Sequence, residues 1–415
     1  MRYLRTCIGL LMAFLLVGGN AYAHAPKETN KTKGKGLEWC YRTALKVDRF
    51  LQRGIDTSYI GLPEHSWRVA LNSGIIGINS NFGAENVMHP LAPDSTYNIY
   101  FNLRTKPSVN LGFNIGLRGF GFGYSWDLMD SRAKTLNFSF GGKYIGVEFL
   151  RQSSSNIRAS NGNNELTSEP DEEPLYFMIT NTTLSVWYAL NSAHYSHNAA
   201  IKQSYIQRKS AGSLLVQIHY ASTELDLDER LHDVIGNIYG CETHQVGIGL
   251  GYGINYTPNK GKVLLHASAM AQLICLSHNL ISQFEEVPIS VGGKDTIATI
   301  YALYRVPSRY PVHVTGTMRA AVSWEINKWV HLSAWAQANN TRFMAQTWGA
   351  DVNLRNWNWQ ANISVAVRLG AGNDRIRKRL GDEEYNRLTA LPAPAEQDLV
   401  KLPNWFTRWF FSPKL

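Results

Sequence analysis

Four histidines of this chain lie on the polar side of stretches in which apolar and polar residues alternate, with serines nearby in the sequence. A serine hydroxyl becomes a nucleophile when a neighbouring base takes its proton, so such a pair could support acyl transfer or hydrolysis. The residues match no known catalytic spacing. We therefore predict no catalytic residue and expect the histidines to hydrogen-bond to neighbouring Arg, Asn or Ser. The histidines are His219, His266, His313 and His331, and the serines are Ser268, Ser323 and Ser333.

Oxygen ligands for a metal ion are densest in one polar stretch. Calcium binds loops rich in carboxylates, but this stretch lacks the Asp-x-Asp-x-Asp-Gly pattern of a calcium loop. The glycines of the chain recur at every second position, whereas a phosphate-binding loop needs a turn from a strand into a helix. We expect a solvated loop and predict no metal and no cofactor. The acidic stretch contains Asp226, Asp228, Glu229, His232 and Asp233.

Charged residues of both signs also occur on the polar faces. An open pore often has a charged constriction, whereas a filled interior contains charges that neutralise one another. The sequence leaves both possibilities open, because it does not give the width of the interior. These residues are Glu148, Lys202, Arg319, Glu325 and Arg368.

The elements that position these side chains repeat every two residues, which is the period of a β-strand. Between residues 246 and 255, Val, Ile, Leu, Tyr and Ile alternate with four glycines and Asn255. Similar alternation returns across most of residues 66–369. Apolar residues are odd-numbered up to Leu117 and even-numbered from Phe120, so a tight turn is predicted at Arg118–Gly119, and a second at 141–143.

The strands and their connections resemble those of a membrane barrel. Counting gives about 12–14 strands of the ~9–11 residues that a tilted membrane strand needs. Short turns at 209–212, 258–261 and 327–328 alternate with long polar loops at 224–243 and 277–309, and short turns face the periplasm in outer-membrane barrels. One acidic connection, 153–174, falls on the side of the short turns. Either a strand is miscounted nearby or this loop points inward.

The composition of the two faces favours the membrane over a soluble sheet. The polar face is rich in Gly, Ser, Asn, Gln and Arg, which suits a polar interior better than a hydrophobic core. Aromatic residues such as Trp126, Tyr188 and Trp324 lie near strand ends, where interfacial girdles form. We predict an all-β fold, an antiparallel transmembrane β-barrel of residues 56–370.

The first 23 residues have the pattern of a cleaved signal peptide. Arg2 and Arg5 precede an apolar run that is too short to span a bilayer, and Ala21 and Ala23 occupy the specificity positions of a signal-peptidase site. We expect an exported chain with no spanning helix, located in the outer membrane.

Charge and cysteine content exclude further classes. The chain has 41 Lys and Arg against 32 Asp and Glu, and the positive residues are scattered, so no nucleic-acid partner is expected. Three cysteines follow the signal peptide, namely Cys40, Cys241 and Cys275. Cys241 and Cys275 could pair across neighbouring strands, but we expect isolated packed thiols.

Both ends of the predicted barrel carry additional segments. A polar linker at 24–36 precedes an amphipathic helix at 37–55, which we expect to pack under or inside the β-structure. A tail at 371–415 contains a charged, helical stretch from Asp374 to Leu388 and an aromatic end that includes Trp405 and Trp409. The tail could anchor the chain at an interface, bind an envelope protein partner or pack on the barrel rim.

Several segments resemble a known family. They are 56–60 (DTSYI), Trp67–Arg68, the hairpin at 117–125, the turn at 207–213 (QRKSAGS) and the strand at 251–256 (GYGINY). Over roughly residues 50–370 the chain is similar to the Bacteroidetes family called domain of unknown function 4421. The resemblance implies an exported, outer-membrane β-barrel and assigns no activity and no site residue.

The sequence thus predicts an outer-membrane β-barrel of unassigned activity, acting as a channel, a ligand-binding barrel or an envelope scaffold. Its expected partners are outer-membrane lipid and the barrel-assembly machinery. We do not expect an enzyme. Two alternatives remain: a lipid-modifying barrel enzyme that uses a Ser–His pair, and a soluble secreted β-protein that binds glycans through its aromatic residues.

Overall fold

The computed structural model describes residues 55–389, together with positions 38, 39, 41–43, 45, 46 and 49. The gaps are 66, 90–91, 107, 143, 156, 162–163, 166–174, 229, 232–236, 259–261, 292–293, 309–310, 347–349 and 371–372. The described residues belong to two compact units, one within Gly54–Gly370 and one within Met1–Arg53 and Ala371–Ala393. The predicted signal peptide, the linker and the aromatic end of the tail lie outside the described residues.

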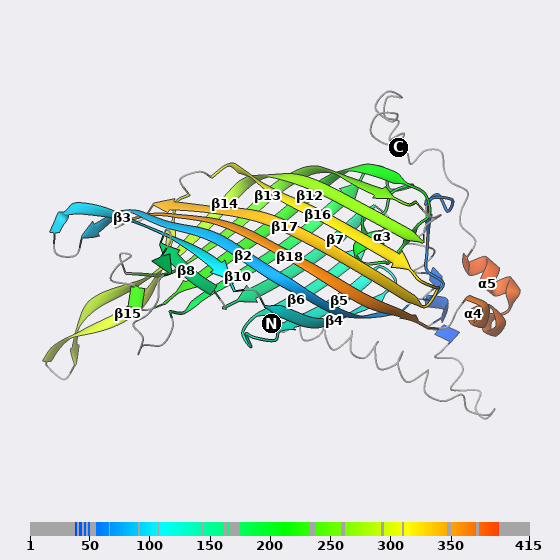
Figure 1. Ribbon diagram of the computed structural model, residues 1–415, viewed down its shortest axis with the longest axis horizontal. Coiled ribbons are helices and arrows are strands. Elements are labelled where there is room, and N and C mark those ends of the chain that lie inside the picture. The colour runs from blue at the N-terminus through cyan, green and yellow to red at the C-terminus, as the bar shows by residue number, and fades with distance from the viewer. Residues whose placement is uncertain are drawn as a thin grey trace, which may run out of the picture. The chain divides into compact units, whose positions relative to one another are not determined.

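Twelve antiparallel strands close a ring in the first unit (Figure 1), because the first strand of the ring pairs with the last. This confirms the predicted antiparallel β-barrel, at the lower end of the expected strand count. In ring order the strands are β2 (Trp67–His89), β4 (Val109–Leu117), β5 (Phe120–Asp127), β6 (Lys134–Gly141), β7 (Ile145–Ser154), β10 (Phe177–Ala189), β12 (Ala211–Leu227), β13 (Ile238–Tyr256), β14 (Val263–Val291), β16 (His313–Glu325), β17 (Val330–Gln346) and β18 (Asp351–Leu369).

Further strands extend the ring at one end. β3 (Ala92–Thr105) pairs with the second half of β2, and β15 (Lys294–Val306) pairs with the second half of β14. β8 (Ile157–Asn161) pairs with β3 and with β9 (Asn164–Glu165). β3, β8 and β15 all lie toward the left end of the barrel in Figure 1. We call this the long-loop end and the opposite one the short-turn end.

The predicted turns and loops are partly confirmed and partly wrong. The two-residue turn at Arg118–Gly119 joins β4 to β5, and Arg118 adopts a left-handed φ of 52° there. The predicted loop at 277–309 is wrong, because β14 and β15 form a long hairpin over most of it. The loop predicted at 224–243 is shorter, since β12 continues to Leu227 and β13 starts at Ile238.

The conflict over the acidic connection at 153–174 comes from a miscounted strand. The predicted turn at 209–212 does not join two wall strands, because residues 190–210 form one connection between β10 and β12. Without the extra strand, the connection after β7, which contains β8 and β9, falls at the long-loop end. Its positions 166–174 are outside the described residues.

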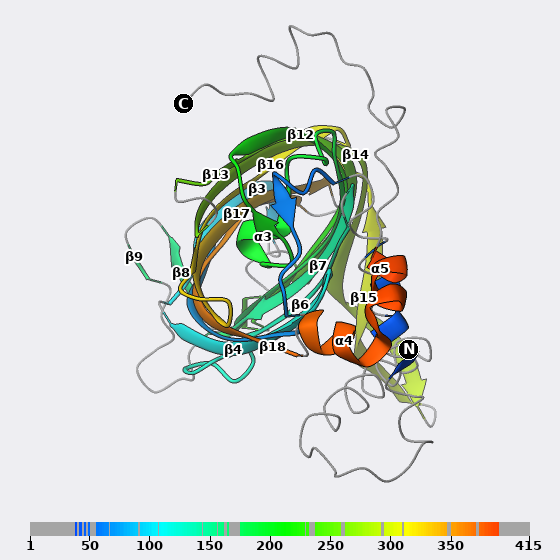
Figure 2. The same ribbon diagram turned by 90° about the vertical axis from the view of Figure 1, so that its right-hand side faces the viewer.

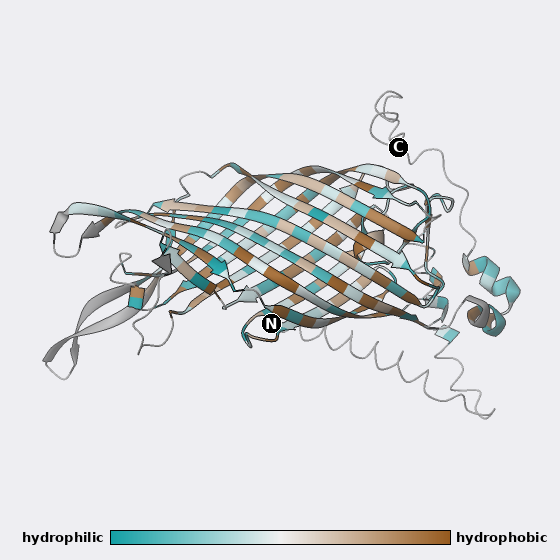
Figure 3. Ribbon diagram, viewed as in Figure 1, coloured by the Kyte–Doolittle hydropathy of each residue, from teal (hydrophilic) through white to brown (hydrophobic). Residues whose placement is uncertain are grey.

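The two faces of the wall differ in the way the sequence predicts. Along β13, Ile248 and Leu250 are each 61% exposed on the outside, while Gly249 and Gly253 are buried inside. Figure 3 shows hydrophobic and hydrophilic residues alternating along the strands around the ring. A bulge at Cys275 shifts the register of β14 against β13 by one residue. Because of this shift, apolar residues of β14 face outward both before and after the bulge.

At the long-loop end the interior is apolar, which the sequence analysis did not anticipate. Phe101 and Leu103, interpreted as part of an outward row, are buried inside, because the phase of alternation changes between β3 and β4. They pack in a cluster with side chains from around the ring, including Phe82, Phe177, Leu225 and Phe343. The outer part of the barrel therefore has a hydrophobic core.

The second unit contains helices from both ends of the chain. The described positions between 38 and 49 are helical, and the tail forms α4 (Asn373–Leu380) and α5 (Asp382–Thr389), which confirms a helical tail. Leu45 is buried against Ile376 and Leu388, so the N-terminal helix packs against the tail helices within this unit. Arg42 Nε lies 3.2 Å from Glu384 Oε1.

No helix among the described residues is long and apolar enough to cross a membrane. Cys241 is buried and Cys275 is exposed, and both thiols are free. The strand partner of Cys241 is Ile281, six residues beyond Cys275, so the two cysteines are not cross-strand neighbours. The expectation of isolated thiols is confirmed for these two, although Cys275 is not packed.

Candidate functional site

The connection between β10 and β12 folds into the barrel at its short-turn end. Residues 190–208, which we call the plug, contain α3 (Asn198–Ile201) and β11 (Ile206–Gln207). β11 pairs with β1 (Ile60–Gly61), so the segment before the first wall strand joins the plug. Figure 2, a view into the ring, shows α3 inside it. The side chains from Tyr195 to Ile201 are buried.

Two glycines of the wall make room for the plug. A Cβ at Gly253 would overlap the hydroxyl of Tyr195, and a Cβ at Gly141 would overlap the side-chain amide of Asn198. Tyr195 also packs with Trp187, Leu215 and Met270 of the wall. On the glycine side of the 246–255 strand, Gly253 is therefore a docking position for the chain's own plug.

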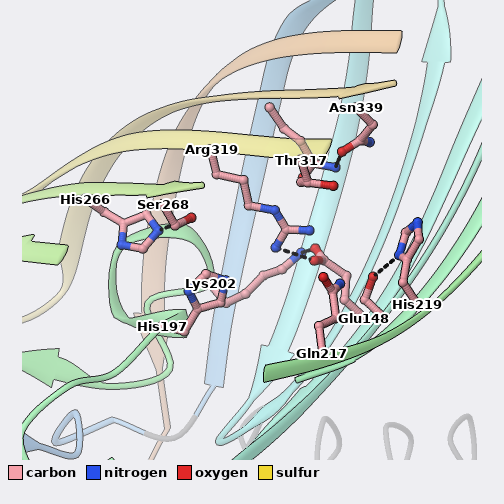
Figure 4. Close-up of polar contacts among 12 residues, drawn as sticks. Glu148, His197, Lys202, Gln217, His219, His266, Ser268, Thr317, Arg319 and Asn339 are labelled. Atoms are coloured by element: carbon pink, nitrogen blue, oxygen red, sulfur yellow. Dashed lines mark hydrogen bonds and ion pairs between the residues drawn. The ribbon is translucent and has the colours of Figure 1, made fainter. Parts of the chain in front are cut away.

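A buried group of charges links the plug to two sides of the wall (Figure 4). The carboxylate of Glu148 on β7 lies 3.3 Å from Lys202 Nζ, at the C-terminal end of α3, and 2.6 Å from Arg319 Nη1 on β16. The three side chains are only 11–14% exposed. Strands β10, β12, β13 and β14 separate β7 from β16 in the ring, so this ion pair crosses the lumen. Of the open alternatives, charges of opposite sign pair with one another here, with one carboxylate shared between two cations.

A second polar layer crosses the lumen nearer the long-loop end. Asn356 Nδ2 on β18 donates a hydrogen bond to Asn181 Oδ1 on β10 over 2.8 Å. Asn358 Nδ2 on β18 donates to Gln152 Oε1 on β7 over 3.1 Å. β10 and β18 lie on opposite sides of the ring. The plug, the charged group, this layer and the apolar cluster therefore lie one after another along the lumen.

One predicted histidine–serine pair has the geometry of a proton relay. His266 Nε2 is 3.2 Å from Ser268 Oγ, and His266 Nδ1 is 2.8 Å from Asn255 Oδ1. Asn255 Nδ2 donates to the carbonyl of Ser196 and to Gln207, so its Oδ1 is the atom left to accept from His266. The proton of His266 then lies on Nδ1, and Nε2 can accept the Ser268 proton. Asn255 and His266 are 0% and 3% exposed.

The other predicted histidines and serines are not combined in this way. His219 Nδ1 lies 3.0 Å from Ser185 Oγ, a serine that the sequence analysis did not single out. Ser323 Oγ accepts from Gln203 of the plug, and Ser333 Oγ lies 2.7 Å from Ser364 Oγ. His331 is buried beside the end of β16, and His313 lies at the start of β16.

The predicted acidic stretch is only partly described, because Glu229, His232 and Asp233 lie outside the described residues. Asp228 accepts hydrogen bonds from Arg230 Nε and Nη2 and from the backbone N–H of Tyr176. The Arg230 side chain, followed by the backbone N–H groups of Tyr176 and Arg230, lowers the pKa of Asp228 to about 2. Through these hydrogen bonds, Asp228 stabilises the turn in which it lies. Within the described part of the chain, no group of three or more His, Cys, Asp or Glu could hold a metal ion.

The plug was not predicted from the sequence, nor were its residues Tyr195 and His197, which pack against His266. The available signal was the loss of two-residue alternation across 190–208, together with the misplaced acidic connection. Lys202 was identified from the sequence as a charged residue on the polar face of the wall, without a predicted partner. Asn255 was visible only as the polar end of the glycine row.

Comparisons with known proteins identify a family and a general likeness. A family model described as "Domain of unknown function (DUF4421)" matches residues 54–369. No curated protein matches the chain. The outer membrane protease OmpT from Escherichia coli is 8% identical, with 76% of this chain and 100% of that chain covered and a TM-score of 0.37.

Two further structures are similar over comparable lengths. The translocator domain of the autotransporter NalP from Neisseria meningitidis is 11% identical, covering 81% of this chain and 97% of that chain, with a TM-score of 0.26. The COG4313 outer membrane channel from Pseudomonas putida F1 is 10% identical, covering 74% and 97%, with a TM-score of 0.27. At these identities and scores, no activity is transferred to the present chain.

Proposed function

The chain belongs to the DUF4421 family. From the geometry of its own residues we propose that it is an outer-membrane β-barrel whose lumen is blocked by parts of the chain itself. Under this proposal it serves as an envelope scaffold and not as an open pore. Under this proposal, outer-membrane lipid contacts the outside of the wall and the barrel-assembly machinery inserts the exported chain. The interior that closes the lumen comes from the plug and from inward side chains of the wall.

The outside of the wall supports insertion into lipid. Large apolar side chains face outward around the ring, and contiguous apolar surface of this extent is rare on soluble monomers. Strands of 17–19 residues, such as β12 and β18, are longer than the ~9–11 residues that cross a bilayer. The wall would therefore extend beyond the lipid at the long-loop end, where its interior is apolar. Outward residues that are more than 60% exposed include Leu71, Ile248, Leu250, Leu276, Val314, Met318 and Ile363.

The observation that carries the closed state is the Glu148 carboxylate, which joins a cation of the plug to a cation across the lumen. Buried charges are retained when they are paired, since an unpaired one costs several kcal/mol. The cross-lumen amide bonds of Asn356 and Asn358 and the apolar cluster add two further barriers in series.

Planar-bilayer recordings of the purified protein test the closed state. We expect no steady conductance, and an ohmic current in every insertion would overturn the proposal. Location is tested by fractionation without detergent: the protein should sediment with outer membranes and migrate faster on gels before heating than after. Recovery of the mature protein in the soluble periplasmic fraction would overturn the membrane proposal and favour a soluble glycan-binding protein.

A second candidate function, acyl-ester hydrolysis, is favoured by the relay of Ser268, His266 and Asn255. His266 Nε2 would take the Ser268 proton as Oγ attacks the acyl carbon, and would return it to the departing alcohol. Water would then release the acid from the serine. Ser268 is 9% exposed and the plug residues Tyr195 and His197 pack against His266, so substrate would reach it only when the plug moves.

A fluorophosphonate probe, which labels activated serines, tests this candidate. We would measure adduct formation at Ser268 by mass spectrometry in the parent protein and in a Gly253→Val variant, whose side chain competes with Tyr195 for space. Ser268→Ala should abolish labelling, whereas Ser333→Ala, which alters a serine bonded to another serine, should leave it unchanged. No adduct in either the parent or the Gly253→Val protein would eliminate the hydrolase.

A further inference from the structure

A small, partly open cavity of about 20 Å³ lies between the plug and the wall at the short-turn end. Four cationic side chains line it, from four different parts of the chain: Arg68 of β2, Arg118 of the β4–β5 turn, Arg368 of β18 and Lys202 of the plug. Ser204 of the plug completes this side of the lining. Lys202 pairs with Glu148, and the other three cationic side chains of the lining are guanidinium groups.

Arg68 and Arg368 occupy directly opposite positions on the paired strands β2 and β18. Like charges placed opposite one another on neighbouring strands destabilise the pair. Both residues are buried, at 8% and 4% exposed. Arg368 repels Arg68, while Glu325 attracts Arg368 from the end of β16.

The hydrogen bonds of these two arginines go to neutral oxygens. Arg68 donates to the side-chain carbonyls of Asn114 and Gln203, and Arg368 Nη2 donates to the backbone carbonyl of Gln203 over 3.1 Å. Arg68 Nε and Ser204 Oγ are buried without a hydrogen-bond partner among the described residues. Leaving such donors buried and unsatisfied costs about 1–3 kcal/mol each, and more for charged groups.

We propose that this cavity binds one monatomic anion of the size of chloride. A cavity needs roughly 10–15 Å³ to hold a particle the size of a water molecule, so about 20 Å³ holds one such particle and excludes phosphate or an organic acid. The anion would offset the charges of Arg68 and Arg368 and accept from the free donors.

The position of the cavity gives the anion a structural role. Pairing of β2 with β18 closes the ring, and Arg68 and Arg368 lie on these two strands. Both arginines also bond to Gln203, which belongs to the plug. The anion would therefore stabilise the closing seam of the barrel and the docked plug together, whether or not the barrel is an open pore.

Thermal unfolding in detergent micelles at constant ionic strength tests the site. Replacing gluconate by chloride or bromide should raise the melting temperature by about 2–4 °C and then saturate, as mass action requires for a ligand of the folded state. Arg68→Gln and Arg368→Gln should abolish this response. Arg355→Gln, an outward position on the same β18, should retain it.

Anomalous diffraction from crystals grown in bromide gives a readout that does not depend on variants. A bromide peak in the cavity, within hydrogen-bond distance of Arg68 Nε, is expected. A parent protein whose melting temperature ignores the halide, or a bromide-soaked crystal with no peak in the cavity, would overturn the proposal. If Arg68→Gln does not fold, Ser204→Ala should still weaken the halide response, and an unchanged response would count against the site.

Discussion

Replacing Glu148 by Gln should release the plug while the wall stays folded. The substitution keeps the shape of the side chain but leaves Lys202 and Arg319 buried and facing each other without a negative charge. Removing one partner of a buried pair costs about 3–5 kcal/mol. Arg319 belongs to β16 and cannot leave the lumen, whereas Lys202 lies on a connection that can undock. We therefore assign most of this cost to docking of the plug.

A loss of about 3 kcal/mol shifts an equilibrium by roughly 100-fold, since each 1.4 kcal/mol is a factor of ten. Amide hydrogen exchange measures this shift directly. Plug amides such as Lys202 N–H, which donates to the carbonyl of Asn198 over 3.0 Å, should exchange roughly 100 times faster in Glu148→Gln than in the parent. Amides in the β12–β13 ladder should keep their parental rates.

Two further variants make the measurement specific. Glu64→Gln removes a carboxylate 3.8 Å from Lys328 Nζ, in a pair whose side chains are 40% and 58% exposed, and should cost less than about 1 kcal/mol. Combining Glu148→Gln with Lys202→Met should cost less than the sum of the two single changes, because they share one interaction. The reasoning is refuted if plug exchange in Glu148→Gln is no faster than in Glu64→Gln.

Three other perturbations test separate parts of the structure. Gly253→Val should displace Tyr195 and speed plug exchange. Gly249→Ala on the same strand, where a Cβ meets Gln217 and Gln272 of the wall and no plug residue, should have a small effect on plug exchange, and equal effects would contradict the docking role of Gly253. In liposomes, Cys275, which lies among outward apolar residues, should react with an apolar maleimide and not with a sulfonated one, and rapid reaction with both would place it in water. The pKa of Asp228 is about 2 in the folded chain, against 3.8 ordinarily. Its contribution to stability is therefore present above about pH 4 and is lost as the pH falls toward 2. Protection of this turn against hydrogen exchange should decline over the same pH range in the parent and not in Asp228→Asn.

The sequence by itself determined the barrel and its two faces. A period of two is a direct consequence of strand geometry, so rows such as Ile248 and Leu250 against Gly249 and Gly253 define an outside and an inside without tertiary information. The same arithmetic located the turn at Arg118–Gly119. These features are local, and a one-residue slip would turn every side chain to the wrong face.

Only the tertiary structure decided what fills the lumen. The plug has no strand period, and its partners are distant in sequence: Lys202 meets Glu148, and Tyr195 meets Gly253. Odd-numbered residues face inward on β3 and outward on β4, and the residue spacing does not reveal this change of phase. Phe101 and Leu103 were therefore predicted to face outward. Contacts across a lumen join strands that are not neighbours in the chain or in the ring. Residue types could nominate Arg368, but ring closure was needed to place it opposite Arg68, whereas His266 and Ser268 meet on a single strand.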